Sequence, residues 1–102
     1  MTPEAAAPVE EVWHLRLYVA GASPNSMKAF ANLRALCEEH LAGRFEIEVV
    51  DLVASPRRAR TDDIVAIPTL VRRLPAPMRK VIGDLSNTDR VLLSLQVPGE
   101  RL

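Results

Sequence analysis

The chain has 102 residues, of which 48% are hydrophobic and 25% are charged, and its thirteen acidic residues balance thirteen lysines and arginines. This length fits one domain with a single hydrophobic core, and a net charge of zero argues against nucleic acid or an anionic membrane as the partner. The apolar runs are too short to span a bilayer, and the one cysteine, Cys37, cannot form an internal disulfide. We expect a cytoplasmic protein with one domain over residues 11–97, a disordered leader over residues 1–10 and a tail over residues 98–102.

The first half of the chain predicts a strand, a helix and a second strand. Val12–Ala20 begins with alternating polar and apolar residues and then becomes continuously apolar, as in a strand that enters a core. Ser23 and Pro24 are typical of a helix start, and Gly43 of a helix end. Phe45–Val53 alternates before it becomes apolar. Strand, helix and strand at this spacing indicate a parallel pair. The apolar stripe expected on the helix consists of Met27, Phe30, Leu33, Cys37 and Leu41.

The second half predicts a short helix and a hairpin. Ser55 and Pro56 repeat the helix-start signal, and the helix that we expect to follow, Arg57–Asp63, is mostly solvated. Thr69–Leu74 and Met78–Ile82 are typical of strands. The link between these two strands is so short that they should pair in antiparallel fashion.

The last segment is compatible with two kinds of structure. Ser86, with Asp89 three residues later, resembles a capping box and predicts a helix over Asn87–Gln96. Residues 91–97 also fit a strand, because periodicity cannot decide so short an apolar run. With the helix, the predicted order is β-α-β-α-β-β-α, which is the order of an α/β thioredoxin-like fold with a mixed sheet.

Five short strings occur in one order along the chain: LYVAG (17–21), SPNS (23–26), IPTL (67–70), LPAP (74–77) and IGDLS (82–86). Together they resemble the signatures of the KaiB family of circadian-clock proteins, over about Leu15–Leu95. The resemblance implies a thioredoxin-like fold with a cis proline at Pro68. It also implies a metamorphic chain, with a βαββααβ ground state that self-associates as a dimer or tetramer.

The resemblance further implies a non-enzymatic protein that binds the hexameric ATPase KaiC and modulates a circadian or timer-like phosphorylation cycle. KaiA is a doubtful partner, because the chain ends soon after Val97 and has a more basic stretch at Arg57–Arg60 than is usual in the family. The alternative is a KaiB-like sensor or adaptor module of a histidine-kinase or stress-response pathway. In the family the C-terminal half rearranges, and the expected switch residues are Pro68, Pro75, Pro77, Gly83, Asp84, Ser94 and Gln96.

Charge is distributed unevenly along the chain. Residues 54–82 hold seven basic residues against two acidic ones, whereas residues 10–51 hold seven acidic residues against four basic ones. Segregated charge can be only a solvated face, but arginines on a short helix and adjacent strands also suit an acidic partner surface. The expected partner-binding residues are Arg57, Arg58, Arg60, Asp63, Arg72, Arg79 and Lys80.

Catalytic chemistry finds no support in the residues. Ser23 and Ser26 occupy the place of the thioredoxin dithiol, and hydroxyls cannot take part in disulfide exchange. Cys37 lies on an apolar stripe, and with His40 it supplies only two potential metal ligands. No glycine-rich phosphate loop is present. We therefore expect no catalytic residue, no metal and no cofactor.

Overall fold

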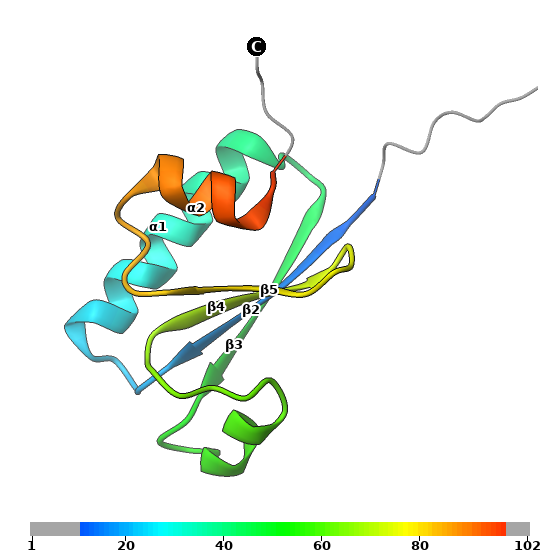
Figure 1. The fold of residues 1–102 in the computed structure, drawn as a ribbon. Coiled ribbons are helices and arrows are strands. Elements are labelled where there is room, and N and C mark those ends of the chain that lie inside the picture. The colour runs from blue at the N-terminus through cyan, green and yellow to red at the C-terminus, as the bar shows by residue number, and fades with distance from the viewer. Residues whose placement is uncertain (1–10, 98–102) are drawn as a thin grey trace, which may run out of the picture.

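The computed structural model describes residues 11–97, which form a four-stranded mixed sheet with two α-helices and one short 3₁₀ helix (Figure 1). The element order confirms the predicted β-α-β-α-β-β-α order, with the 3₁₀ helix in place of the second helix. The elements are β2 (Trp13–Val19), α1 (Pro24–His40), β3 (Phe45–Asp51), η2 (Pro56–Arg60), β4 (Thr69–Leu74), β5 (Arg79–Ile82) and α2 (Thr88–Leu95). The predicted leader and tail, residues 1–10 and 98–102, lie outside the described residues.

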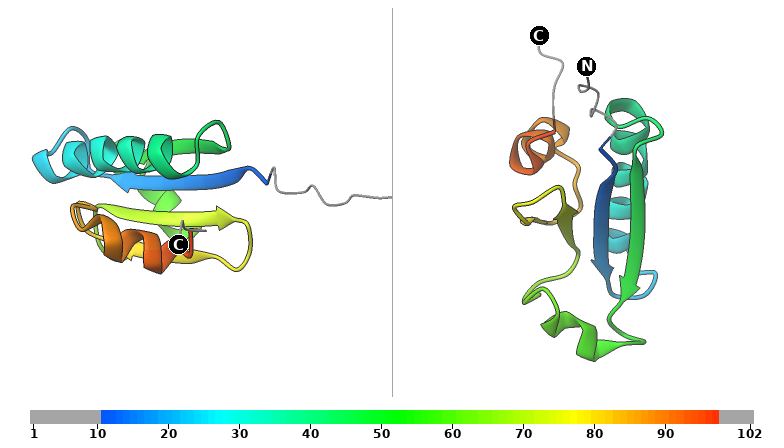
Figure 2. Two further views of the ribbon diagram at one scale, coloured as in Figure 1. Left: turned by 90° about the horizontal axis from the view of Figure 1, so that it is seen from above. Right: turned by 90° about the vertical axis from the view of Figure 1, so that its right-hand side faces the viewer.

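The strands lie side by side in the order β3-β2-β4-β5. β2 and β3 are parallel, whereas β4 is antiparallel to both β2 and β5. Both predicted pairings, the parallel pair around α1 and the antiparallel hairpin, are therefore confirmed. Because β2 and β3 are parallel, their carboxyl ends meet at one end of the sheet, and η2 lies beyond that end (Figure 2).

The main core lies between the sheet and the two α-helices. Trp13, Leu15 and Leu17 alternate along β2 and join one buried cluster with residues from both helices. Full burial of a leucine or valine side chain stabilises the fold by roughly 1.5–3 kcal/mol relative to exposure. The helical members of the cluster are Ala29, Leu33, Leu36 and Cys37 of α1 with Val91 and Leu95 of α2.

A smaller cluster covers part of the opposite sheet face. It consists of buried Tyr18, Val50 and Val71, against which Leu52 and Ile64 pack. Leu52 and Ile64 belong to the segment between β3 and β4, so this segment, which contains η2, is held against the sheet by few apolar side chains.

The buried stripe of α1 differs from the predicted one. Leu33 and Cys37 are buried as expected, but Met27 is 61% exposed and Phe30 is 38% exposed. Ser26 and Ala29 are buried instead, because their small side chains let the start of the helix lie close to the sheet. The Ser26 hydroxyl is satisfied there, since it accepts a hydrogen bond from the backbone N–H of Ala20 at 3.1 Å.

The last segment is a helix, but Ser86 is not its cap. Asn87 occupies the N-cap position, and its side chain accepts a hydrogen bond from the backbone N–H of Arg90 at 3.1 Å. The predicted capping box at Ser86 is therefore wrong. Val91 and Leu95 are both buried, whereas Leu93, midway between them, is 79% exposed. A strand would place all three side chains on one face, so this pattern of burial fits a helix.

The short helix is shorter than predicted, and none of its residues is buried, as expected for a mostly solvated helix. It ends at Arg60, and Asp63 adopts the left-handed conformation with φ +53°. Asp62, expected on a solvated face, is only 4% exposed. The peptide bond before Pro68 is cis, as the family resemblance implies, and those before Pro75 and Pro77 are also cis.

Candidate functional site

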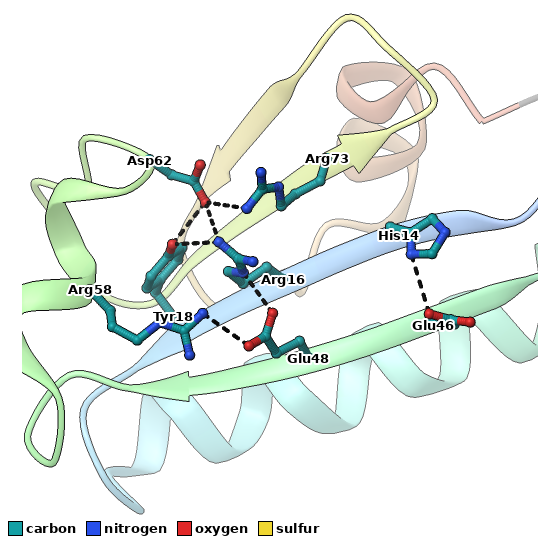
Figure 3. A network of polar contacts seen from close by, with 8 residues as sticks. All are labelled: His14, Arg16, Tyr18, Glu46, Glu48, Arg58, Asp62 and Arg73. Atoms are coloured by element: carbon teal, nitrogen blue, oxygen red, sulfur yellow. Dashed lines mark hydrogen bonds and ion pairs between the residues drawn. The ribbon is translucent and has the colours of Figure 1, made fainter.

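A polar network occupies the sheet face opposite the helices (Figure 3). At its centre the Asp62 carboxylate, 3% exposed, accepts a hydrogen bond of 2.8 Å from the Tyr18 hydroxyl. Arg16 Nη1 donates to the same oxygen at 3.2 Å, and Arg73 Nη1 lies 4.0 Å from it. Burial raises the pKa of the Tyr18 hydroxyl, so it remains a donor at neutral pH. Because Asp62 follows η2 and its partners lie on strands, the network ties the η2 segment to the sheet.

Glu48 of β3 extends the network to η2. Its Oε1 accepts a hydrogen bond from Arg16 Nε at 2.8 Å, and its Oε2 accepts one from Arg58 Nη2 at 3.0 Å. The hydrogen bond from Arg58 and then that from Arg16 lower the pKa of the Glu48 carboxyl, so it is ionised at neutral pH. One carboxylate therefore bridges two guanidinium groups from different elements.

A groove of about 400 Å³ runs along the same sheet face. His14 Nδ1 lies 3.2 Å from Glu46 Oε1 at one side of it. Both signs of charge meet in the groove, and each acidic side chain that lines it has a basic neighbour. The lining residues are His14, Leu15, Arg16, Glu46, Ile47, Glu48, Arg73 and Leu74.

The structure separates the predicted partner-binding residues into two groups. Arg57, Arg58 and Arg60 lie on η2, and Asp63 follows it. Lys80 of β5 joins them, because its Nζ donates to the backbone oxygen of Asp63 at 3.3 Å. We call this set of five residues the basic face. Within residues 11–97, the exposed side chains of Arg57 and Arg60 have no hydrogen-bond or ion-pair partner.

Arg72 and Arg79 lie elsewhere. The two residues are register partners on β4 and β5, and Arg79 shares the helix-facing side of β5 with buried Val81. Lys80 points to the opposite side. In this fold the seven residues do not share one surface, because side chains alternate along each strand. Their role in partner binding stays a prediction.

Arg72 is not available to a partner in this fold. It is 3% exposed, and its Cζ lies 5.2 Å from the centroid of the Trp13 ring. Its Nη1 donates to the backbone oxygen of Leu95, and its Nη2 donates to that of Pro77 at 2.6 Å. Burial lowers the pKa of the Arg72 guanidinium. In this fold the side chain holds the end of α2 and the β4–β5 hairpin to the sheet, and a contact of Arg72 with a partner stays a prediction.

Exposed apolar side chains lie in the same segment as η2, and none of them was among the predicted site residues. Val53 is 73% exposed, Val65 is 90% exposed and Ile67 is 43% exposed, all within the segment between β3 and β4. Glu48 and Asp62 were likewise not among the predicted site residues. Alternation of charged residues along β2 and β3 was a signal that cross-strand ion pairs would form, but it does not name the partners from η2.

The predicted switch residues lie in the turns and at the end of α2. Asp84 Oδ1 accepts from the backbone N–H of Ser86 at 3.0 Å, and these contacts with Ser86 lower the pKa of the Asp84 carboxyl. Gly83 has φ +118°, which favours glycine, and Gln96 ends α2 with φ +58°. Ser94 is partly buried on α2. The role of these residues in a switch stays a prediction.

The start of α1 carries two serines where a thioredoxin carries its dithiol. The Ser23 hydroxyl donates to the Ser26 hydroxyl at 2.9 Å, and neither position offers a thiol, because the cysteine of this chain, Cys37, is buried further along the helix. Within residues 11–97, no helix is long and apolar enough to cross a membrane. The same residues contain no group of three or more potential metal-ligating side chains.

Comparison with known proteins shows the family. The KaiB domain matches residues 16–97. The chain belongs to the KaiB family. It is 42% identical over 88 residues to "Circadian clock protein KaiB3" of Synechocystis sp., covering 86% of each chain. It is 41% identical over 96 residues to "Circadian clock oscillator protein KaiB" of Trichodesmium erythraeum, covering 94% of this chain and 92% of the relative.

Solved structures confirm the thioredoxin-like fold of this KaiB family protein. The N-terminal domain of Synechococcus elongatus SasA matches with a TM-score of 0.69 and 21% identity, covering 99% of this chain and 97% of that domain. Mitochondrial thioredoxin 3 of Saccharomyces cerevisiae matches with a TM-score of 0.66 and 17% identity, covering 84% of this chain and 79% of that one. The chain thus combines a thioredoxin-like backbone with membership of the KaiB family.

The cysteine of this KaiB family protein should be inert in the folded state. Burial raises the pKa of the Cys37 thiol to about 12, so at pH 8 roughly one thiol in ten thousand is a thiolate. We expect dithionitrobenzoate to label Cys37 only after unfolding in urea. A Cys37→Ser, Met27→Cys variant, with its thiol at an exposed position of the same helix, should react at once. Rapid labelling of the native protein would contradict burial of Cys37.

Proposed function

We propose that this protein is a regulatory partner of a KaiC-type hexameric ATPase and modulates a circadian or timer-like phosphorylation cycle. The observation that carries the proposal is the basic face, where Arg57 and Arg60 project from η2 without partners among residues 11–97. Free guanidinium groups pair bidentately with carboxylates and steer the encounter with an acidic surface. Membership of a family whose relatives are named clock oscillator proteins supports a clock partner.

The exposed apolar side chains beside the basic face strengthen the case for docking. Val65 is 90% exposed and Val53 is 73% exposed, although both lie in a segment that is otherwise fastened to the sheet. Apolar side chains surrounded by charged ones are typical of interfaces, where they lose contact with water on binding. The proposed interface therefore has an apolar centre at Val53 and Val65 and a charged rim at the arginines.

Charge reversal on the basic face tests this function. Arg57→Glu with Arg60→Glu should abolish co-migration with a purified KaiC-type hexamer in gel filtration, because like charges would then meet the acidic partner. Lys28→Glu with Arg34→Glu, which makes the same change of net charge on α1, should leave co-migration intact. Equal binding by both double variants would show that the basic face is not the docking surface. Absence of binding by the unmodified protein under every nucleotide condition would refute the proposed function.

A sensor or adaptor module of a histidine-kinase pathway is the second candidate. The backbone likeness to the SasA N-terminal domain, over 99% of this chain, favours it. The two candidate functions differ in the protein that is bound. Co-migration with a KaiC-type hexamer would favour the regulatory partner of the ATPase over the histidine-kinase module. Fold switching, self-association and a cytoplasmic location stay predictions under either candidate, and KaiA stays a doubtful partner.

A further inference from the structure

Glu48 lies at the border of the basic face and forms an ion pair with one of its arginines, Arg58. Its side chain is 48% exposed on β3, and it reaches across to the 40% exposed side chain of Arg58 on η2, with Oε2 and Nη2 3.0 Å apart (Figure 3). Within residues 11–97, Arg58 is the only residue of η2 whose side chain has an acidic partner. A neighbouring arginine, Arg57, has none.

Glu48 is not needed to hold Arg16 in place. Arg16 Nη1 also contacts the Tyr18 hydroxyl at 3.3 Å and the Asp62 carboxylate at 3.2 Å. The η2 segment is likewise fastened by buried Asp62 and by Ile64. An exposed ion pair such as Glu48–Arg58 adds little to stability. Its main effect is therefore on the charge that the basic face offers to a partner.

We propose that Glu48 is an internal competitor that weakens the docking of an acidic partner on Arg58. The inference rests on the proposed function and concerns how that same face is regulated. A partner carboxylate that reaches Arg58 must either displace Glu48 or sit beside it, and two carboxylates about 6 Å apart repel each other. The protein therefore binds a KaiC-type hexamer less tightly than it would without the Glu48 carboxylate.

Two variants with the same net charge separate this effect from bulk electrostatics. Glu48→Gln and Glu46→Gln each remove one negative charge from the same face of β3, but Glu46 contacts His14 rather than an arginine of η2. We expect Glu48→Gln to lower the Kd for a KaiC-type hexamer about threefold to tenfold relative to Glu46→Gln. In an Arg58→Gln background this difference should disappear.

Retention on a heparin column provides a readout without the ring. Glu48→Gln should elute at higher salt than Glu46→Gln, because only the first substitution frees Arg58, and the two should elute together in the Arg58→Gln background. The inference would be overturned if Glu48→Gln and Glu46→Gln eluted from heparin at the same salt concentration and bound the KaiC-type hexamer with the same Kd. A higher Kd for Glu48→Gln than for Glu46→Gln would also overturn it. A heparin difference without ring binding by any form would instead refute the proposed function and keep the pairing of Glu48 with Arg58.

Discussion

Replacing Arg72 with methionine should lower the free energy of unfolding by about 3 kcal/mol. The substitution replaces the guanidinium side chain with a shorter apolar one and leaves the carbonyl oxygens of Leu95 and Pro77 without their buried donor. It also removes the guanidinium stacked on Trp13. Urea unfolding followed by circular dichroism measures the loss, and hydrogen exchange should show faster opening of α2.

The neighbouring residue is the control for this prediction. Arg73 is an exposed arginine on the same strand, and Arg73→Met should change the free energy of unfolding by less than about 0.5 kcal/mol. The free energy of unfolding of Arg72→Lys should lie between those of Arg72→Met and Arg73→Met, because an ammonium group can reach one of the two carbonyl oxygens but not both. Equal stability of Arg72→Met and Arg73→Met would show that the buried guanidinium does not fasten α2.

Replacing Asp62 with alanine should cost about 3 kcal/mol of stability and release the η2 segment from the sheet. The Tyr18 hydroxyl and Arg16 Nη1 would lose their shared acceptor in a part-buried site. Few apolar contacts hold this segment, so loss of the carboxylate should act there first. The amides of residues 52–66 should then exchange faster than those of α1.

Two asparagine variants separate charge from hydrogen bonding. Asp62→Asn keeps an oxygen that can accept the Tyr18 hydroxyl, so it should recover part of the loss measured for alanine. Asp63→Asn, at an exposed position that asparagine tolerates in the left-handed conformation, should be close to neutral. Unchanged exchange of residues 52–66 in Asp62→Ala would mean that apolar contacts alone seat the segment.

The positions and types of the elements could be predicted from the sequence because they depend on neighbours along the chain. Proline after serine starts α1, alternation marks β2 and β3, and the short link before Arg79 requires an antiparallel hairpin. The family could also be identified, because its motifs are short strings of consecutive residues such as LYVAG and IGDLS. The candidate site was predicted in part, as the arginines of η2.

Local pattern does not determine which way a side chain faces when both faces of an element are partly apolar. On α1, stripes through Met27 and Phe30 or through Ser26 and Ala29 have similar helical spacing, and contact with the sheet selected the second. Capping by Ser86 or Asn87 was also a choice between adjacent residues. Such choices are made by packing and by single hydrogen bonds, which the sequence pattern does not contain.

The sequence by itself determined the order of the elements, the family and the concentration of arginine in the second half of the chain. Only the tertiary structure decided that Arg72 is buried while Arg57 is exposed, and that Glu48 and Asp62 bind partners far away in the chain. The physical reason is that an arginine is buried only where carbonyl oxygens or carboxylates meet it. Those acceptors come from Leu95, on α2, and from other elements that are brought together only when the sheet has formed.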